Sequence, residues 1–200
     1  MLENMLLLNW ILGTGILFLE FAFLGKFISL LIVTFGKGNF KKSYLEIVYK
    51  TKERIFTKFG LDVLSDKFLI FFVFIFSLVS SMLTLVYSEI FLQIPCALCW
   101  FERIFMYGIL ILSAIALTKN PPQNQIKNIF IFSIFGAAFS FYHHILQMTA
   151  GANSHLPCPT SGGDCAKRLI FEYGHITFPW MAFVLFAFFI VIILLQKKLK

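Results

Sequence analysis

Five apolar stretches dominate this chain, and each is about long enough to cross a lipid bilayer as a helix. A spanning helix needs about 20 mostly apolar residues, and the stretches cover residues 5–24, 68–92, 100–117, 128–149 and 176–195. In water, a chain of 200 residues could not shield 59% hydrophobic residues with only 14% charged ones. We therefore expect an all-α integral membrane protein with five transmembrane helices.

The basic residues predict how these helices are oriented. Of the 17 lysines and arginines, eight lie in the 36–67 linker, two in the 118–127 loop and three in the tail 197–200. Because cytoplasmic loops of membrane proteins are enriched in Lys and Arg, these three segments are expected to be cytoplasmic. By alternation, Cys96, Cys99 and the 150–175 loop then lie on the outer face. The same distribution argues against a basic groove and hence against a nucleic-acid partner.

Residues 1–67 are predicted to form an N-terminal unit apart from a bundle over 68–196 and a tail over 197–200. Apolar residues resume over 27–35, so its transmembrane helix is expected to be long, tilted or kinked near Gly25. The linker that follows repeats apolar residues at near-helical spacing, with lysines elsewhere on the wheel. We expect an interfacial helix on anionic lipid there, the alternatives being a disordered linker or a partner-binding arm.

Two of the four cysteines form the motif Cys96-Ala-Leu-Cys99, which follows Pro95 and opens the third span. A C-x-x-C pair can form a disulfide, bind a metal or remain inert. A thiol at a helix start faces unpaired N–H groups that favour its anion, and Arg103 lies one turn after Cys99. We therefore predict that Cys99 is a redox-active thiolate.

The other two cysteines, Cys158 and Cys165, lie in a stretch rich in proline and glycine that is predicted to be an exposed outer loop. The six residues between them can close into a disulfide ring, either as a structural staple or as a second redox pair. Zinc held by all four cysteines is disfavoured, because the outer face is oxidising and lacks a second close-spaced pair. Two thiol pairs on one face indicate electron transfer between a soluble protein and a molecule dissolved in lipid.

Titratable residues in the spans supply candidates for binding such a molecule. Arg103 is the only arginine in the five spans, where a charge is costly unless it is paired or used. Its guanidinium could donate hydrogen bonds to a quinone carbonyl. His144 could do the same or transfer a proton, with simple hydration as the equal alternative. For His143 we expect hydration, and for Glu102 an interfacial ion pair with Arg103.

The motif Cys96-Ala-Leu-Cys99-Trp-Phe-Glu-Arg103 resembles the hallmark of the disulfide bond formation protein B (DsbB) family of thiol oxidases and its bacillary relatives. The resemblance spans about 68–195 and continues in Tyr142-His143-His144-Ile-Leu-Gln147, Ser161-Gly-Gly-Asp-Cys165-Ala-Lys-Arg168 and Pro179-Trp180. It implies a four-helix bundle in a bacterial cytoplasmic (inner) membrane, with ubiquinone or menaquinone near the outer surface. The N-terminal helix and the basic segment would be additions to that bundle.

The resemblance also implies a division of labour among the cysteines. Cys158 would receive the attack of a soluble DsbA-like thioredoxin-fold dithiol partner, and Cys165 would pass the electrons to Cys96. Cys99 would face the quinone, with Arg103 and His144 beside the ring. The loop between the second pair is much shorter than in enterobacterial members and is similar to the bacillary form.

These observations predict a membrane thiol:quinone oxidoreductase that reoxidises its partner and so supports disulfide bond formation. One alternative is a vitamin K epoxide reductase-like oxidase, in which the loop cysteines precede the C-x-x-C motif rather than follow it. Another is a non-enzymatic membrane scaffold with structural disulfides. Spacing alone does not fix the direction of electron flow.

Overall fold

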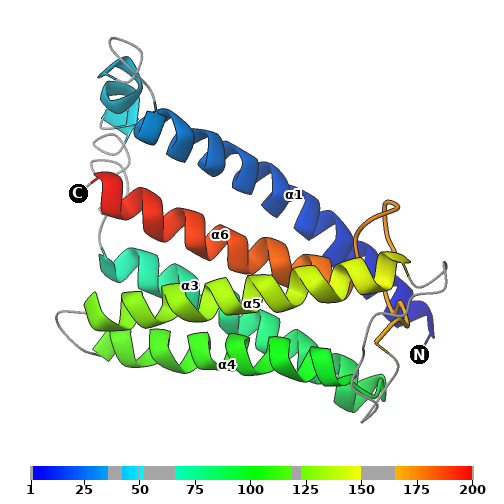
Figure 1. The fold of residues 1–200 in the computed structure, drawn as a ribbon. Helices are drawn as coiled ribbons and strands as arrows, with labels where there is room; N and C mark the ends of the chain where they lie inside the picture. The colour runs from blue at the N-terminus through cyan, green and yellow to red at the C-terminus, as the bar shows by residue number, and fades with distance from the viewer. Residues whose placement is uncertain are drawn as a thin grey trace.

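The computed structural model describes residues 2–35, 42–48, 50–51, 66–118, 123–149 and 165–199. Its main helices are α1 (Leu2–Phe35), α3 (Asp66–Leu85), the π-helix η1 (Val86–Ile90), α4 (Ala97–Thr118), α5 (Gln123–Thr149) and α6 (Phe178–Leu199), shown in Figure 1. Within these residues, five helical segments are long and apolar enough to cross a membrane. The prediction of an all-α, five-span membrane protein is confirmed.

Helices α3 to α6 form a bundle in which each helix runs back alongside the one before it (Figure 1). α5 packs between α4 and α6, and α4 packs on α3, whereas α3 and α6 make few direct contacts. The core between these helices is built from aliphatic and aromatic side chains. Its fully buried members are Ile70, Val73, Ile109, Ile129, Phe186 and Phe189.

Two glycines allow the bundle helices to approach closely. A Cβ atom added at Gly136 of α5 would lie 2.6 Å from Cζ of Phe186 on α6, and one at Gly108 of α4 would overlap the ring of Phe132 on α5. Small residues at such positions bring membrane helices together, since packing rather than water exclusion holds them there.

Helix α1 lies outside this bundle and packs along α6 (Figure 1). It runs without a break through Gly25, so it is long and continuous rather than divided there. Only 6% of its most apolar window is buried inside the protein, which leaves most of its surface for lipid. In the linker that follows, residues 42–48 and 50–51 are helical, and the rest of the predicted interfacial helix lies outside the described residues.

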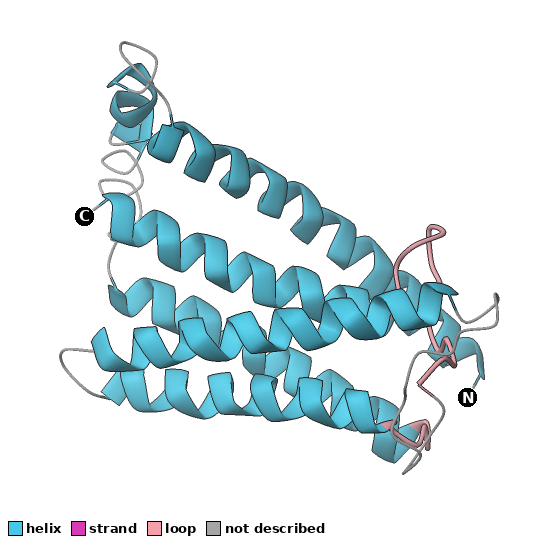
Figure 2. Cartoon of the chain, in the orientation of Figure 1, coloured by secondary structure: helices cyan, strands magenta, loops and turns pink. Residues whose placement is uncertain are grey.

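The described loops gather at one end of the bundle, together with the N-terminus (Figure 2). We call this the cysteine end: it comprises η1, residues 91–96, the end of α5 and residues 165–177. The opposite end, where α3 and α5 begin and α6 terminates, carries Lys127, Lys197 and Lys198 and is called the lysine end.

Candidate redox site at the cysteine end

Cys96 occupies the N-cap of α4. The helix begins at Ala97, and the backbone N–H of Cys99 donates to the Cys96 sulfur over 3.2 Å. The Trp100 N–H donates to the Cys96 carbonyl at the same distance. A side chain that accepts from the third residue of a helix is the usual N-cap arrangement, and the dipole there favours an anion. The helix start therefore stabilises a thiolate at Cys96.

The two sulfurs of the motif lie 2.7 Å apart as free cysteines, Cys96 buried and Cys99 partly buried. A disulfide bond is about 2.05 Å long, so little movement separates this pair from its oxidised form. The Cys99 thiol, followed by His143, lowers the pKa of Cys96 to about 4, although burial opposes the shift. Sequence reasoning assigned the thiolate to Cys99, but the structure favours Cys96 because the N-cap sulfur receives these donors.

His143 and Glu102 lie directly behind Cys96. The Nε2 atom of His143 is 3.7 Å from the Cys96 sulfur, and its Nδ1 is 2.8 Å from Oε1 of Glu102. The side chains are only 1% and 12% exposed. We expected a hydrated His143 and an ion pair between Glu102 and Arg103. Instead the two residues meet across the α4–α5 interface, because both point into the bundle rather than toward lipid.

The surroundings of His143 indicate its protonation state. Nδ1 faces a carboxylate, and Nε2 also lies 3.2 Å from the backbone carbonyl of Cys165. Both groups accept hydrogen bonds, so an imidazolium with two N–H donors would satisfy them together; the Gln147 amide nitrogen, a donor, also lies 3.5 Å from Nε2. The Cys96 thiolate would add a third acceptor beside the same ring. The result resembles the nucleophile, base and orienting acid of a cysteine-based active site.

Cys165 completes this cluster. It is disulfide-bonded, fully buried and packed with Cys96, Leu98 and Leu146. The sequence predicted an exposed loop here, but residue 165 is covered because its segment folds down onto the end of α5. Cys158, the other member of the predicted pair, lies outside the described residues.

Two polar side chains fasten this segment to α5. Gln147 donates through Nε2 to the carbonyl of Lys167 over 3.1 Å. Arg168 donates through Nε to the carbonyl of Gln147 over 2.8 Å and through Nη2 to that of Met148 over 3.4 Å. An arginine that covers the last carbonyls of a helix acts as a C-terminal cap. Both residues lie in the motifs that carry the family resemblance, but the sequence alone assigns neither of them a role.

Arg103, predicted to contact a quinone, reaches from α4 to the end of α3. Its Nη2 donates to the carbonyl of Thr84 over 3.0 Å, and Nη1 lies 3.5 Å from Oγ of Ser88 on η1. The guanidinium also lies 5.3 Å from the ring centroid of Trp100. A π-helical turn such as η1 is frequent at functional sites. The predicted role of Arg103 in cofactor binding remains a prediction.

His144, the other predicted cofactor residue, points away from the cysteines toward α6. Its Nδ1 is 2.9 Å from Oγ1 of Thr177, and its ring lies 4.7 Å from that of Trp180. Consecutive helical residues diverge by about 100°, so His143 and His144 serve different interfaces. The structure brings His143, rather than His144, to the sulfurs.

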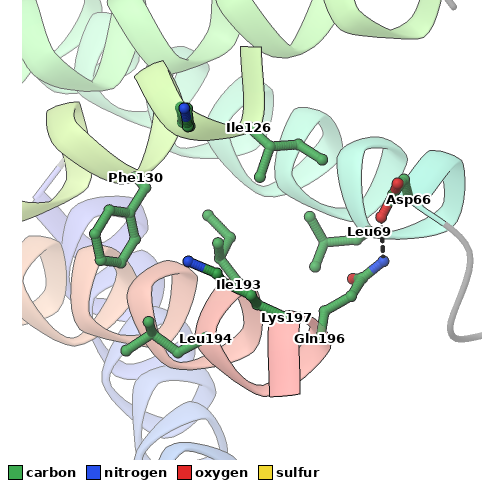
Figure 3. Close-up of a pocket in the computed structure, with 9 residues that line it drawn as sticks. Asp66, Leu69, Ile126, Phe130, Ile193, Leu194, Gln196 and Lys197 are labelled. Atoms are coloured by element: carbon green, nitrogen blue, oxygen red, sulfur yellow. Dashed lines mark hydrogen bonds between the residues drawn. The ribbon is translucent and has the colours of Figure 1, made fainter. Parts of the chain in front are cut away.

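Two further features bear on ligands. The sulfurs of Cys96 and Cys99 and a ring nitrogen of His143 all lie within 4.8 Å of one another, a set that could hold a metal ion. The predicted absence of a metal stays a prediction. A cavity lies at the lysine end, lined by apolar residues such as Leu69 and Phe130 and by Lys197 (Figure 3). It is separate from the cysteine cluster.

Comparisons with known proteins match most of this chain. A family model described as disulfide bond formation protein DsbB matches residues 66–196. The chain is 37% identical over 131 residues to the SPbeta prophage-derived disulfide bond formation protein B of Bacillus subtilis, covering 64% of this chain and 86% of that protein. It is 33% identical over 124 residues to disulfide bond formation protein C of the same organism, covering 62% and 88%.

A third relative, a probable disulfide formation protein of Metapseudomonas resinovorans, is 32% identical over 119 residues, covering 60% of this chain and 81% of that protein. No solved structure matches the chain. The matched region contains all the cysteines of the buried cluster, namely the Cys96–Cys99 pair and Cys165. The chain is therefore a multi-pass membrane protein with a role in disulfide formation, and this role makes it a thiol–disulfide oxidoreductase. It belongs to the disulfide bond formation protein DsbB family.

Proposed function

We propose that this protein is a thiol:quinone oxidoreductase that reoxidises a soluble DsbA-like thioredoxin-fold partner and passes the electrons to membrane quinone. One observation carries the proposal: the Cys96 and Cys99 sulfurs, 2.7 Å apart, pack beside the disulfide-bonded Cys165 in one buried cluster. Two thiol pairs that exchange with each other must come together in this way.

The electrons move by two successive thiol–disulfide exchanges. The partner's dithiol attacks the Cys158–Cys165 pair, which becomes a dithiol as the partner's disulfide forms. That dithiol then attacks the Cys96–Cys99 disulfide. Each exchange forms one S–S bond and breaks one, so two electrons and two protons move inward together. Reclosure of Cys96–Cys99 releases both electrons and both protons to the acceptor.

His143 and Glu102 serve the inner pair in this scheme. The imidazolium stabilises the Cys96 thiolate that forms when the second pair reduces the Cys96–Cys99 disulfide. The carboxylate of Glu102, 2.8 Å from Nδ1, holds the ring in place and offsets its charge. Reclosure of the disulfide removes the thiolate charge, so the same ring can then release a proton.

The residues at the cysteine end fit a quinone, which supplies a two-electron acceptor that also takes up two protons. Arg103 has five N–H donors and uses two in the described contacts, so others remain for a carbonyl oxygen. His144 binds Thr177 through Nδ1, and among the described residues Nε2 has no hydrogen-bond partner, which leaves it for a second contact. Both side chains are half-buried, and each lies beside a tryptophan, Trp100 for Arg103 and Trp180 for His144. We propose Arg103 and His144 as the groups that hold the ring.

The proposed orientation places the cysteine end at the outer face of the bacterial cytoplasmic membrane and the C-terminus in the cytoplasm. The supporting observation is the charge at the lysine end, where Lys127, Lys197 and Lys198 gather. Positive charge favours the cytoplasmic side of a membrane protein. An outward cysteine end also lets a soluble partner reach the second pair.

The proposal is tested with purified protein, a reduced thioredoxin-fold dithiol protein and a short-chain ubiquinone under anaerobic conditions. We expect thiol-dependent loss of the quinone absorbance, abolished in Cys99→Ser while helical circular dichroism persists. A scaffold with structural disulfides would give no such loss in the wild type. Trapping a mixed disulfide through Cys158, with a partner variant lacking its second thiol, then identifies the partner.

A metal site is the second candidate, because Cys96, Cys99 and His143 form a three-ligand set. Zinc favours sulfur and imidazole ligands, and a three-residue site leaves a position open. Metal analysis of the protein purified without chelator separates the two functions. A stoichiometric ion that is lost in Cys96→Ser and is needed for activity would support the metal centre; a metal-free protein that reduces quinone supports the thiol relay.

A further inference from the structure

Helix α1 lies outside the residues matched by the family model, yet a partly buried hydrogen bond joins it to the start of α6, next to the cysteine end. We propose that Glu20 of α1 is a positioning residue for the quinone-binding end, holding the indole of Trp180 against His144. This inference rests on the proposed function, since it assigns Glu20 a part in presenting a side chain to quinone.

The first step is the contact of Glu20 itself. Its Oε1 accepts a hydrogen bond of 2.5 Å from Nε1 of Trp180, and Nε2 of His175 lies 3.6 Å from the same oxygen. The carboxylate is 21% exposed, within a helix that otherwise faces mostly lipid. A carboxylate inside a membrane span is costly and is usually paired and functional. The Glu20 side chain therefore points toward the bundle, where it has partners, and not toward lipid.

The second step leads from Trp180 to His144. The two rings lie 4.7 Å apart, and Oγ1 of Thr177 lies 2.9 Å from Nδ1 of the histidine. The indole covers the imidazole from one side while Thr177 fixes one of its nitrogens. Because Glu20 holds Nε1 of the indole, it restricts rotation of the Trp180 ring. The position of Nε2 of His144, the nitrogen that faces no hydrogen-bond partner among the described residues, thus depends on α1.

The third step shows that α1 is seated firmly at this end. Asn9 accepts a hydrogen bond from the hydroxyl of Tyr87 on η1, and both side chains are buried. Tyr87 in turn packs edge-on against Phe178 of α6, with ring centroids 4.5 Å apart. At Gly13, an added Cβ would lie 3.3 Å from Cβ of Glu172. α1 therefore contacts both η1, which continues α3, and the segment that leads into α6. Helices α3 and α6 themselves make few direct contacts with each other.

These contacts distinguish a positioning role from a membrane anchor. An anchor requires only apolar length, so replacing Glu20 by leucine would improve it. A positioning residue requires an acceptor at this site, which glutamine supplies through its side-chain oxygen and leucine does not. Glu20→Gln is thus the conservative variant, and Glu20→Leu and Glu20→Ala are the disruptive ones.

The test measures the indole and the quinone separately. In ¹⁵N-labelled protein the three tryptophans give three indole N–H signals, and Trp180→Phe identifies that of Trp180. We expect Glu20→Leu and Glu20→Ala to move this signal upfield and to weaken binding of short-chain ubiquinone about tenfold. The rate of exchange between the partner and the cysteine pairs should stay within twofold of wild type. Glu20→Gln should restore quinone binding to within twofold.

The control is Phe18→Leu, a change two residues away at a side chain that is 78% exposed. It should leave both the indole signal and quinone binding unchanged. If the wild type binds quinone and Glu20→Leu and Glu20→Ala bind it equally well, Glu20 has no positioning role and the proposed function stands. If the wild type binds no quinone, the proposed function fails and this inference falls with it.

Discussion

Glu102 of α4 and His143 of α5 meet inside the bundle, with 2.8 Å between the carboxylate oxygen and Nδ1. The contact fixes the imidazole so that its other nitrogen lies 3.7 Å from the Cys96 sulfur. A buried charged pair is retained at a cost in desolvation, which makes a functional use more informative than a stabilising one. In the proposed relay this use is to hold a cation beside a thiolate.

The thiolate of Cys96 should titrate at low pH. Its pKa is lowered to about 4, first by the Cys99 thiol and then by His143. Thiolate absorbance at 240 nm should therefore stay level from pH 6 to 8 and fall only as the pH drops through about 4. In His143→Gln the midpoint should rise toward the ordinary cysteine range of about 8.5, and in Cys99→Ala it should rise further.

This titration is carried out in a Cys158→Ser, Cys165→Ser background, so that only the inner pair absorbs. His144→Gln is the matched control, because His144 faces Thr177 and Trp180 rather than the sulfurs. An unchanged midpoint in His143→Gln would show that the imidazole does not stabilise the thiolate.

Glu102→Gln and Glu102→Leu should separate orientation from charge. The glutamine oxygen can still accept from Nδ1 of His143, whereas leucine leaves that nitrogen without a partner. We expect electron passage from the second pair to Cys96–Cys99 to slow about tenfold in the glutamine variant, which keeps the acceptor. In the leucine variant it should slow about a hundredfold, the lower limit of general acid–base effects. Quenched-flow alkylation measures the rate; equal rates in all three proteins would exclude the carboxylate from the reaction.

Loss of Arg168 should loosen the segment that carries Cys165. Arg168 covers the carbonyls of Gln147 and Met148 at the end of α5, and a hydrogen bond from a charged donor contributes about 1.5–3 kcal/mol. Arg168→Met should lower the free energy of unfolding by about 2 kcal/mol and speed amide hydrogen exchange over residues 165–170. Lys167→Met removes a neighbouring exposed charge and should change neither quantity; equal effects of the two variants would contradict the capping role.

Gly136 should be intolerant of a side chain. A Cβ there would lie 2.6 Å from the fully buried ring of Phe186, so Gly136→Ala forces the α5–α6 interface apart. Overpacking of this kind costs about 1–3 kcal/mol. Gly25→Ala on α1 meets nothing within 4 Å and should instead stabilise its helix by about 0.5–1 kcal/mol. Unfolding in mixed detergent micelles compares the two; a stable Gly136→Ala variant would contradict the close approach.

The five spans and the C-x-x-C motif at a helix start could be predicted because they depend on local composition and order. The identity of the thiolate could not be, since it depends on where α4 begins. A helix that starts at Ala97 makes Cys96 the N-cap, whereas the apolar run alone suggested a later start. A shift of three residues at a helix end thus moves the N-cap, and with it the stabilised thiolate, from Cys99 to Cys96.

The roles of His143 and His144 were equally out of reach of the sequence. The two residues are adjacent, and which one faces α4 depends on the rotation of α5 about its axis. Apolar residues occur on all sides of α5, so the hydrophobic pattern of its sequence does not determine that rotation. Packing of Gly136 against Phe186 and the bond to Glu102 do so in the structure.

The most direct test of the proposed function is a single turnover with the protein alone. Protein with a reduced Cys96–Cys99 pair and Cys158→Ser, Cys165→Ser is mixed anaerobically with excess short-chain ubiquinone, and free thiols and quinone absorbance are followed together. The relay predicts loss of one quinone per protein as both thiols disappear, and no loss in the matched Cys99→Ser variant. Thiols that persist beside an unchanged quinone would contradict it.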